Sequence, residues 1–253
     1  MRLATFNILH GRSLSDDRVD LDRFRRAIRL LDADVLALQE VDRDQPRSHL
    51  ADLTAVAADV MGAIEHQFVA AVSGTPGATW VAATGDEQPG TATYGIALLS
   101  RHPALSWQVI RLPRVPGRVP VWLPGSRRVV ITREEPRTAV VAELDTPVGG
   151  LAVANTHLSF VPGWNRLQLR TLCRNLAPLR EPVVLLGDLN LTNPRAAARA
   201  GYRALARRPT FPADAPLRQL DHVLVRGGLG PVRTVDTPVI DVSDHRPLVV
   251  QIA

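Results

Sequence analysis

Short apolar runs alternate with helical patterns along the first third of the chain. Residues 2–8 have the pattern of a strand, residues 34–42 form an apolar run that ends in acids, and residues 68–72 resume a strand. Between them, apolar residues at helical spacing predict helices at 24–31 and 50–61. This strand, helix, strand order predicts an α/β or α+β sandwich.

The rest of the chain continues the alternation. Strands are predicted at residues 94–100, 105–112, 137–144, 150–155, 183–186, 219–225 and 247–252, and helices at residues 164–176 and 193–200. Small, turn-forming residues predict an exposed loop at 74–90. Prolines and arginines, with Trp122 among them, predict another at 113–128, either a substrate contact or, as we favour, an ordinary surface loop.

Composition favours one compact domain. The chain has 253 residues, 45% of them hydrophobic, and it contains no linker tract, low-complexity block or repeat. We therefore expect a single domain spanning residues 1–253. All 30 basic residues are arginine and the net charge is +5, which makes an anionic substrate plausible because guanidinium groups bind phosphate and do not titrate.

Cysteine usage and hydropathy indicate in which cellular compartment the protein is expected. Cys173 has no second cysteine to pair with, so an intramolecular disulfide is excluded and buried filler is its expected role. No stretch reaches the eighteen or so apolar residues of a membrane span, and no signal peptide pattern precedes the first strand. A cytoplasmic location is expected.

Polar residues stand at the ends of apolar strands. After Val183–Leu186 come Asp188 and Asn190, which project from the same side, either as a site at the rim of a sheet or as an Asx turn that caps the next helix. In all, eight polar residues lie at or beside the end of an apolar strand: Asn7, Glu40, His157, Asp188, Asn190, Asp221, Asp244 and His245. Eight such positions predict that these side chains converge on one site at the edge of the sheets. Carboxylate and amide oxygens suit Mg²⁺ or Mn²⁺ better than zinc.

Six ordered motifs resemble the endonuclease/exonuclease/phosphatase superfamily, and together they cover nearly the whole chain. They are Thr5-Phe6-Asn7, Leu38-Gln39-Glu40-Val41-Asp42, Asn155-Thr156-His157-Leu158, Gly187-Asp188-Leu189-Asn190, Leu220-Asp221-His222-Val223 and Ser243-Asp244-His245-Arg246-Pro247. The resemblance implies a four-layer α/β (α+β) sandwich, two mostly antiparallel β-sheets packed face to face with helices outside. It also implies metal-dependent cleavage of phosphate esters.

The resemblance assigns expected roles residue by residue. Glu40 matches the principal ligand of a Mg²⁺ (or Mn²⁺) ion, with Asn7 in the same shell and Asp244 as a further ligand to metal or water. Asp188 and Asn190 match the pair that orients or deprotonates the attacking water and holds the phosphate.

The imidazoles and one arginine complete the expected site. His245 matches an imidazole paired with Asp221, and its role as base or as electrostatic clamp stays open. His157 would donate to a non-bridging phosphate oxygen, and Arg137, with Asn7, would bind the substrate phosphate. Two positions depart from the family pattern. Leu9 replaces a frequent acid, which favours one metal ion over two, and Ile96 replaces a frequent Asn beside the phosphate.

The resemblance favours a phosphodiesterase or nuclease. Its rival is a phosphoesterase acting on phospholipid or inositol phosphate, which the lack of a basic amphipathic helix disfavours. A third hypothesis, from another class, is a catalytically inactive binding module with the same fold. The expected partner is a phosphate-ester substrate, with nucleic acid as one candidate, a membrane lipid headgroup less favoured, and no obligate protein partner evident.

Overall fold

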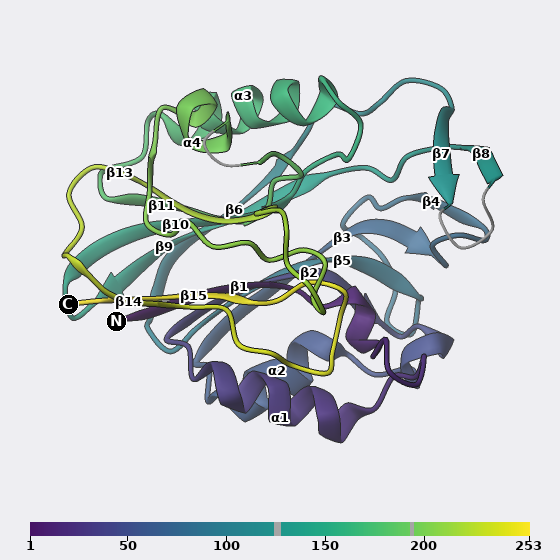
Figure 1. The fold of residues 1–253 in the computed structure, drawn as a ribbon, viewed down its shortest axis with the longest axis horizontal. Helices are drawn as coiled ribbons and strands as arrows, with labels where there is room; N and C mark the ends of the chain where they lie inside the picture. Colours follow the sequence, from purple (N-terminus) through teal and green to yellow (C-terminus); the bar gives the residue numbers. More distant parts are fainter. Residues whose placement is uncertain (124–127, 193–194) are drawn as a thin grey trace.

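Two β-sheets pack face to face with helices on their outer sides. The computed structural model describes residues 1–123, 128–192 and 195–253. In Figure 1, α1 and α2 lie below the lower sheet, and α3 and α4 lie above the upper one. The predicted four-layer α/β sandwich is thus confirmed. No helix in the described ranges is both long enough and apolar enough to cross a membrane.

The lower sheet has seven strands, in the order β14-β15-β1-β2-β5-β3-β4. Their bounds are β1 Arg2–Asn7, β2 Val35–Arg43, β3 Glu65–Gly74, β4 Trp80–Ala82, β5 Thr93–Ser100, β14 Val232–Asp236 and β15 Leu248–Ile252. β1 runs parallel to β2, and the other neighbours are antiparallel. Strands β4 and β14 are short edge strands that the sequence pattern did not predict.

The upper sheet has six strands, in the order β12-β13-β11-β10-β9-β6. Their bounds are β6 Ala104–Arg111, β9 Thr138–Thr146, β10 Gly149–His157, β11 Val183–Asp188, β12 Arg203–Ala204 and β13 Asp221–Arg226. Here β10 and β11 are parallel and the other pairs antiparallel. Each sheet therefore holds one parallel pair, so "mostly antiparallel" is the right description.

A hairpin occupies part of the segment expected to be an irregular loop. Strands β7 (Val119–Leu123) and β8 (Arg128–Thr132) pair antiparallel, and they lie at the right edge of Figure 1. Valines in both arms and Ile131 in β8 favour strand, and Pro120 is tolerated because a two-stranded ribbon has free edges. The side chains of Trp122 and Arg128, and the whole of Arg127, lie outside the described residues.

Helices cover the sheets through apolar faces. The helices are α1 Leu21–Leu31, α2 Leu53–Met61, α3 Trp164–Leu176 and α4 Arg195–Ala200, with two single 3-10 turns at Leu9–Gly11 and Pro46–Ser48. Asp20 and Asp52 cap α1 and α2 by accepting hydrogen bonds from first-turn backbone N–H groups. Phe24, Ile28 and Leu31 of α1 are buried against the lower sheet. Residues 193–194, where we expected the last helix to begin, lie outside the description.

A polar bridge joins the two sheets in the middle of an apolar core. Asn155 of β10 donates through Nδ2 to the carbonyl oxygens of Leu38 (2.9 Å) and Ala97 (2.8 Å) in the lower sheet. Its Oδ1 accepts from Gln39 Nε2 at 2.7 Å. All these groups are buried, so the bridge fixes how β10 sits over β2. That alignment brings the end of β10 next to the end of β2.

Candidate active site

Strand ends from both sheets meet at one rim. Asn7 ends β1, His157 ends β10 and Asp188 ends β11. Because β10 and β11 are parallel and in register, His157 lies beside Asp188. β13 runs antiparallel and starts at Asp221, which pairs with Asp188 from the other side. Register therefore gathers these side chains from distant parts of the sequence.

Glu40 reaches the rim through a distorted backbone. The pairing of β2 with β5 shifts register between Gln39 and Val41, and Glu40 has a φ of +58°. A positive φ is strained for a residue with a side chain, and such strain is typical of functional sites. Glu40 Oε1 accepts a hydrogen bond from Asn7 Nδ2 at 3.0 Å. Burial raises the pKa of Glu40 to about 7, opposed by that bond and reinforced by the charge of Asp244.

Asp188 lies at the centre of the site. Its Oδ2 accepts from Asn7 Nδ2 at 3.2 Å and lies 3.5 Å from Nε2 of His157 and 3.8 Å from Nε2 of His245. The side chain is 2% exposed. Burial raises the pKa of Asp188 to about 6, although the charge of His245 lowers it. One carboxylate therefore contacts or neighbours three of the predicted site residues.

The Asx turn considered for Asp188 is present together with the site, although the next helix, α4, begins only at Arg195. Oδ1 of Asp188 accepts from the backbone N–H of Asn190 at 3.0 Å, and Asn190 has a φ of +48°. Asn190 Nδ2 then donates to the carbonyl of Leu158 at 3.0 Å and lies 3.4 Å from His157 Nε2. One oxygen of Asp188 holds the turn and the other faces the site, so the two interpretations are compatible.

The two imidazoles differ in charge. His245 Nδ1 lies 2.8 Å from Asp221 Oδ2 while its Nε2 faces Asp188, so both ring nitrogens face carboxylates. Burial lowers the pKa of His245, but the charge and hydrogen bond of Asp221 outweigh it and raise the pKa to about 10. For His157, burial and then the charges of Arg137 and His245 hold the pKa well below 6.5. His245 is therefore cationic and His157 neutral at pH 7.

Arg137 and Asp244 lie at the border of the site. Arg137 is buried, its NH2 nitrogen is 3.6 Å from Glu134, and its Nε has no hydrogen-bond partner among the described residues. Asp244 is half-buried, and its negative charge raises the pKa of Glu40. Both residues act on the site through their charge in this structure.

Ser243 was quoted in a motif but given no role from the sequence. Its hydroxyl donates to the carbonyl of Asn7 at 2.6 Å and accepts from the backbone N–H of His245 at 3.1 Å. It thereby ties the end of β1 to the loop that carries the imidazole. Phe211, also missed, packs its ring 4.8 Å from that of His245. These roles become visible only from contacts in the folded structure, because an uncharged side chain gives no signal of a site in the sequence.

The donor set around Glu40 fits a hard divalent cation. Glu40 is a half-buried carboxylate with a raised pKa and the negative charge of Asp244 nearby, and a bound cation would offset this unfavourable charge. Asn7 presents Nδ2 to the carboxylates and accepts from the Leu9 N–H through Oδ1, so coordination through oxygen requires its amide to rotate. Ligand atoms of Asp188, Asp221 and His245 also lie within 4.8 Å of one another. That trio is already joined by the Asp221–His245 bond, so Glu40 is the better anchor.

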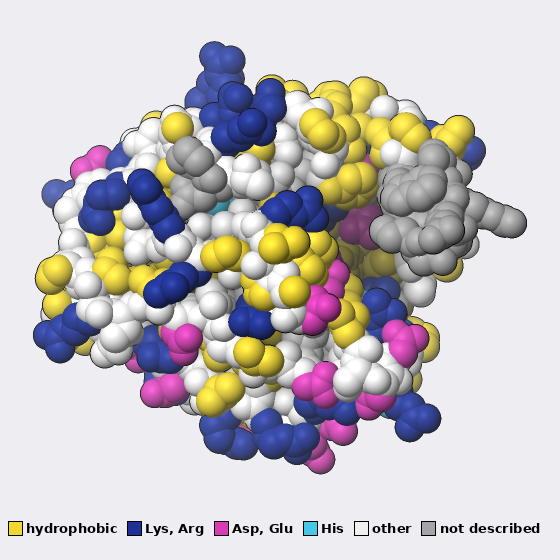
Figure 2. Space-filling view, in the orientation of Figure 1, with side chains coloured by type: hydrophobic (Ala, Val, Ile, Leu, Met, Phe, Trp, Pro, Cys, Tyr) yellow, Lys and Arg dark blue, Asp and Glu magenta, His cyan; other side chains and the backbone are white. Residues whose placement is uncertain are grey.

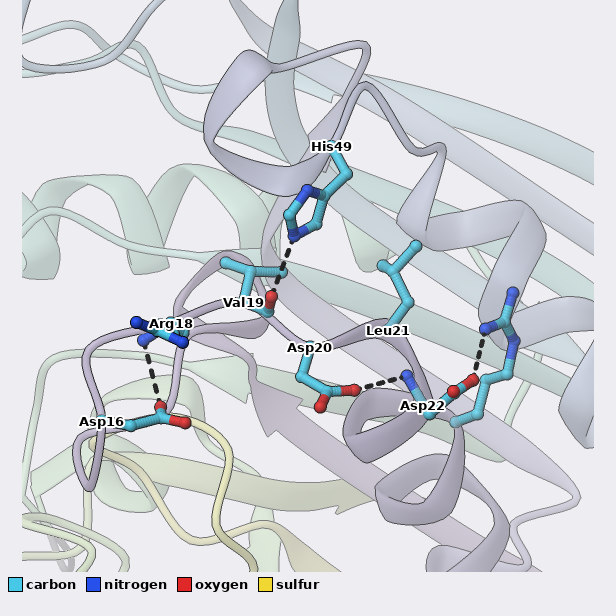
Figure 3. Close-up of a pocket in the computed structure, with 8 residues that line it drawn as sticks. Asp16, Arg18, Val19, Asp20, Leu21, Asp22 and His49 are labelled. Carbon is cyan, nitrogen blue, oxygen red and sulfur yellow. Dashed lines mark hydrogen bonds and ion pairs between the residues drawn. The ribbon is translucent and has the colours of Figure 1, made fainter.

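The surface is hollowed between the two sheets. Figure 2 shows this depression beside the residues drawn in grey, with acidic side chains visible inside it. A different cleft lies at the start of α1, lined by Asp16, Asp20, Asp22 and His49 among others (Figure 3). Its acids are already engaged, since Asp16 pairs with Arg23 and Asp20 caps the helix. The acidic side chains of that cleft therefore stabilise the start of α1 and its neighbouring loop.

The sequence profile described as the Endonuclease/Exonuclease/phosphatase family matches residues 4–245. The chain belongs to this family. Its members are phosphoesterases and nucleases, so the predicted class of hydrolase is supported at that level. The family typically uses divalent metals. A search of curated proteins gives no match.

Solved structures of similar fold include three of interest. An endonuclease/exonuclease/phosphatase from Beutenbergia cavernae has a TM-score of 0.73 and 24% identity, covering 99% of this chain and 70% of that one. The Bacteroides thetaiotaomicron mannosyl-6-phosphatase Bt3783 has a TM-score of 0.66 and 15% identity, and the match covers 100% of this chain and 99% of that one. Sphingomyelinase C from Streptomyces griseocarneus has a TM-score of 0.63 and 16% identity, and the match covers 100% of this chain and 99% of that one. These likenesses establish the shared fold.

Proposed function

We propose that the protein is a Mg²⁺- or Mn²⁺-dependent phosphodiesterase, with nuclease activity as the favoured form. The observation that carries the proposal is Asp188, a buried carboxylate with Asn7, His157 and His245 around one oxygen. Such an arrangement positions a water molecule next to a group that can take its proton. The family's hydrolytic chemistry gives that water a phosphate ester to attack.

Each side chain has a part in the proposed reaction. Asp188 accepts a proton from water while the water oxygen bonds to phosphorus. The ester P–O bond breaks with its electron pair on the leaving oxygen, which then takes a proton from solvent. Asn190 holds the Asp188 turn, and the cationic His245 donates from Nε2 to the charge that develops on the phosphoryl group. Asp221 holds the His245 ring through Nδ1. His245 therefore acts as an electrostatic donor, because its protonated ring cannot serve as the base.

The remaining residues bind the phosphate and the ion. Glu40 would hold the ion with help from Asn7 and Asp244, and the bound ion would polarise a phosphoryl oxygen and neutralise its charge. Neutral His157 donates one ring N–H to a non-bridging oxygen. Arg137 offers a guanidinium nitrogen that has no hydrogen-bond partner in the described part of the chain.

The test compares a diester with its monoester. The purified protein is assayed on bis-(p-nitrophenyl) phosphate and on p-nitrophenyl phosphate with Mg²⁺, with Mn²⁺ and with EDTA, then on plasmid DNA and phosphatidylinositol phosphates. We expect metal-dependent nitrophenol release, faster on the diester. Preference for the monoester, or cleavage of lipid alone, would refute the diesterase and nuclease assignment. No release on any substrate would favour the inactive binding module.

Two variants test the assigned residues. His245→Gln and Asp188→Asn remove the charge but keep size, and each should lower kcat by about 100-fold or more. Asp59→Asn changes an exposed carboxylate of α2 and serves as the matched control. Near-normal turnover by either site variant would contradict its role.

A further inference from the structure

Two adjoining cavities form a groove beside the catalytic centre. The first, of about 470 Å³, and the second, of about 710 Å³, share Ala82 and Arg114 in their walls. We call this the arginine groove and define it by Trp80, Arg111, Arg114, Arg118, Arg133 and Arg137. None of the described residues that line it is a carboxylate. β4 and the β7–β8 hairpin flank it at the right of Figure 1.

The inner end of the groove borders the proposed catalytic centre. Arg137 lines the first cavity, and its charge also acts on His157 and on Glu135 beside it. Thr138 follows in the same wall and its carbonyl accepts from Thr156, the neighbour of His157. A ligand whose phosphate lies at the centre can therefore extend directly into the groove.

The middle of the groove combines a planar ring with cations. The guanidinium carbon of Arg114 lies 5.8 Å from the centroid of the Trp80 ring. Trp80 is half-buried and packs against the cluster that contains Val72 and Tyr94, which fixes the ring in place. Arg111 donates to the carbonyl oxygens of Ala83 and Thr84, and so holds the wall together.

Two of the groove's arginines have no carboxylate partner among the described residues. Some arginines elsewhere pair with carboxylates at 4 Å or less, as Arg23 does with Asp16 and Arg47 with Asp42. Neither Arg114 nor Arg118 has such a partner within the described part of the chain. Two cations in one groove, neither paired with a carboxylate of the described residues, attract an anion.

We propose that the arginine groove binds a single-stranded nucleic acid that extends beyond the phosphate to be cleaved. This inference rests on the proposed function and names the substrate class. Spaced arginines suit the repeated phosphates of a strand, and an aromatic ring suits an unstacked base. Arg114 and Arg118 contact phosphates, and Trp80 offers its ring to a base.

Binding is measured without catalysis. Fluorescence anisotropy follows a fluorescein-labelled 12-mer of deoxythymidylate in EDTA at 50 to 200 mM NaCl, with the full chain. Arg114→Ala and Arg118→Ala should each weaken binding about 5-fold. Each should also reduce the slope of log K against log salt by about 0.7, as for one lost phosphate contact on a single strand. Arg170→Ala, at an exposed arginine of α3, is the control and should bind like the unmodified chain.

The ring is tested by altering the ligand as well as the protein. Trp80→Leu should weaken binding at least about 5-fold and Trp80→Phe should restore part of it, since base stacking contributes roughly 1–3 kcal/mol per base. An abasic strand of equal charge should bind the unmodified protein more weakly by a similar factor. This second measurement decides the question even when the leucine variant does not fold.

Several results would overturn the proposal. They are unchanged binding in the groove variants, an equal loss in Arg170→Ala, equal binding of duplex and single strand, and tighter binding of inositol hexakisphosphate or of phosphatidylinositol-phosphate vesicles. Hydrolysis of bis-(p-nitrophenyl) phosphate separates the two hypotheses. A strand that binds the groove in a protein without hydrolytic activity refutes only the proposed function. Hydrolysis without groove-dependent binding refutes only this inference.

Discussion

Replacing Glu40 by glutamine should stabilise the metal-free protein. Burial raises the pKa of Glu40 from 4.5 to about 7, so keeping this carboxylate ionised costs folding free energy at pH 8. At about 1.4 kcal/mol for each unit of pKa, the cost is at most about 3.4 kcal/mol. Because the side chain is only half-buried, solvent screens part of this, and we expect about 2 kcal/mol. Glutamine keeps an oxygen that accepts from Asn7.

The assay is thermal unfolding in EDTA across pH. Glu40→Gln should raise Tm at pH 8 by roughly 4 to 8 °C, at about 2 to 4 °C per kcal/mol for a chain of this size. The folded pKa lies above the unfolded one, so the ionised carboxylate destabilises the fold fully above pH 7. That penalty disappears as the pH falls from about 7 towards 4.5. The advantage of glutamine should disappear in the same window.

Metal addition reverses the ranking. With 10 mM Mg²⁺ the unmodified protein should gain Tm, because an ion that binds the folded state stabilises it, and Glu40→Gln should gain much less. Asp59→Asn, at an exposed carboxylate, should follow the unmodified protein in both conditions. A variant less stable than the unmodified protein at pH 8 in EDTA would refute the buried-charge reasoning. An equal gain with Mg²⁺ would remove Glu40 from the ion site.

Three further changes test the packing around the site. His10 has its pKa lowered to about 3, by burial and then by Arg47 and Arg12, so its folded state must stay neutral and loses stability as the pH falls from about 6.5. His10→Asn should therefore lose less stability between pH 7 and 5 in urea unfolding. Asn155→Ala breaks three buried hydrogen bonds and should cost about 2–4 kcal/mol by the same method. Gly187→Ala places a Cβ 1.9 Å from a backbone oxygen and should destabilise far more than Gly150→Ala, whose added Cβ meets nothing within 4 Å.

Apolar patterns predicted most of the elements because the sheets are covered on both faces. Strands such as β11 read as unbroken apolar runs, and helix α1 as a regular apolar stripe. The elements that the pattern did not predict are strands at the edges of the sheets. β4, β12 and β14 are two to five residues long and largely exposed, so no period marks them. The β7–β8 hairpin was hidden by its prolines, which are usual in loops and tolerated in a free ribbon.

Motifs predicted which charged residues share the rim, and the structure places Glu40, Asp188 and His245 there. Their roles stay predictions until the variants are measured. Sequence spacing could not predict that Ser243 ties β1 to the His245 loop, or that Asn155 aligns the sheets. Both depend on contacts between residues more than 100 positions apart, and polar residues with such partners look like ordinary surface residues in the sequence. For the arginine-rich segment 113–128, the sequence left open a substrate contact or an ordinary surface loop, and it did not indicate that Trp80 and Arg137 line the same groove.

The position of Glu40 shows most clearly what the sequence leaves open. In a regular strand, neighbouring side chains point to opposite faces. Gln39 faces the upper sheet, where it bonds Asn155, so a regular Glu40 would point into the apolar layer under the helices. The bulge gives that place to Val41, which is buried there, and turns Glu40 to the rim beside Asn7. The strain of a positive φ is thus the cost of keeping an apolar layer intact while delivering a carboxylate to the site.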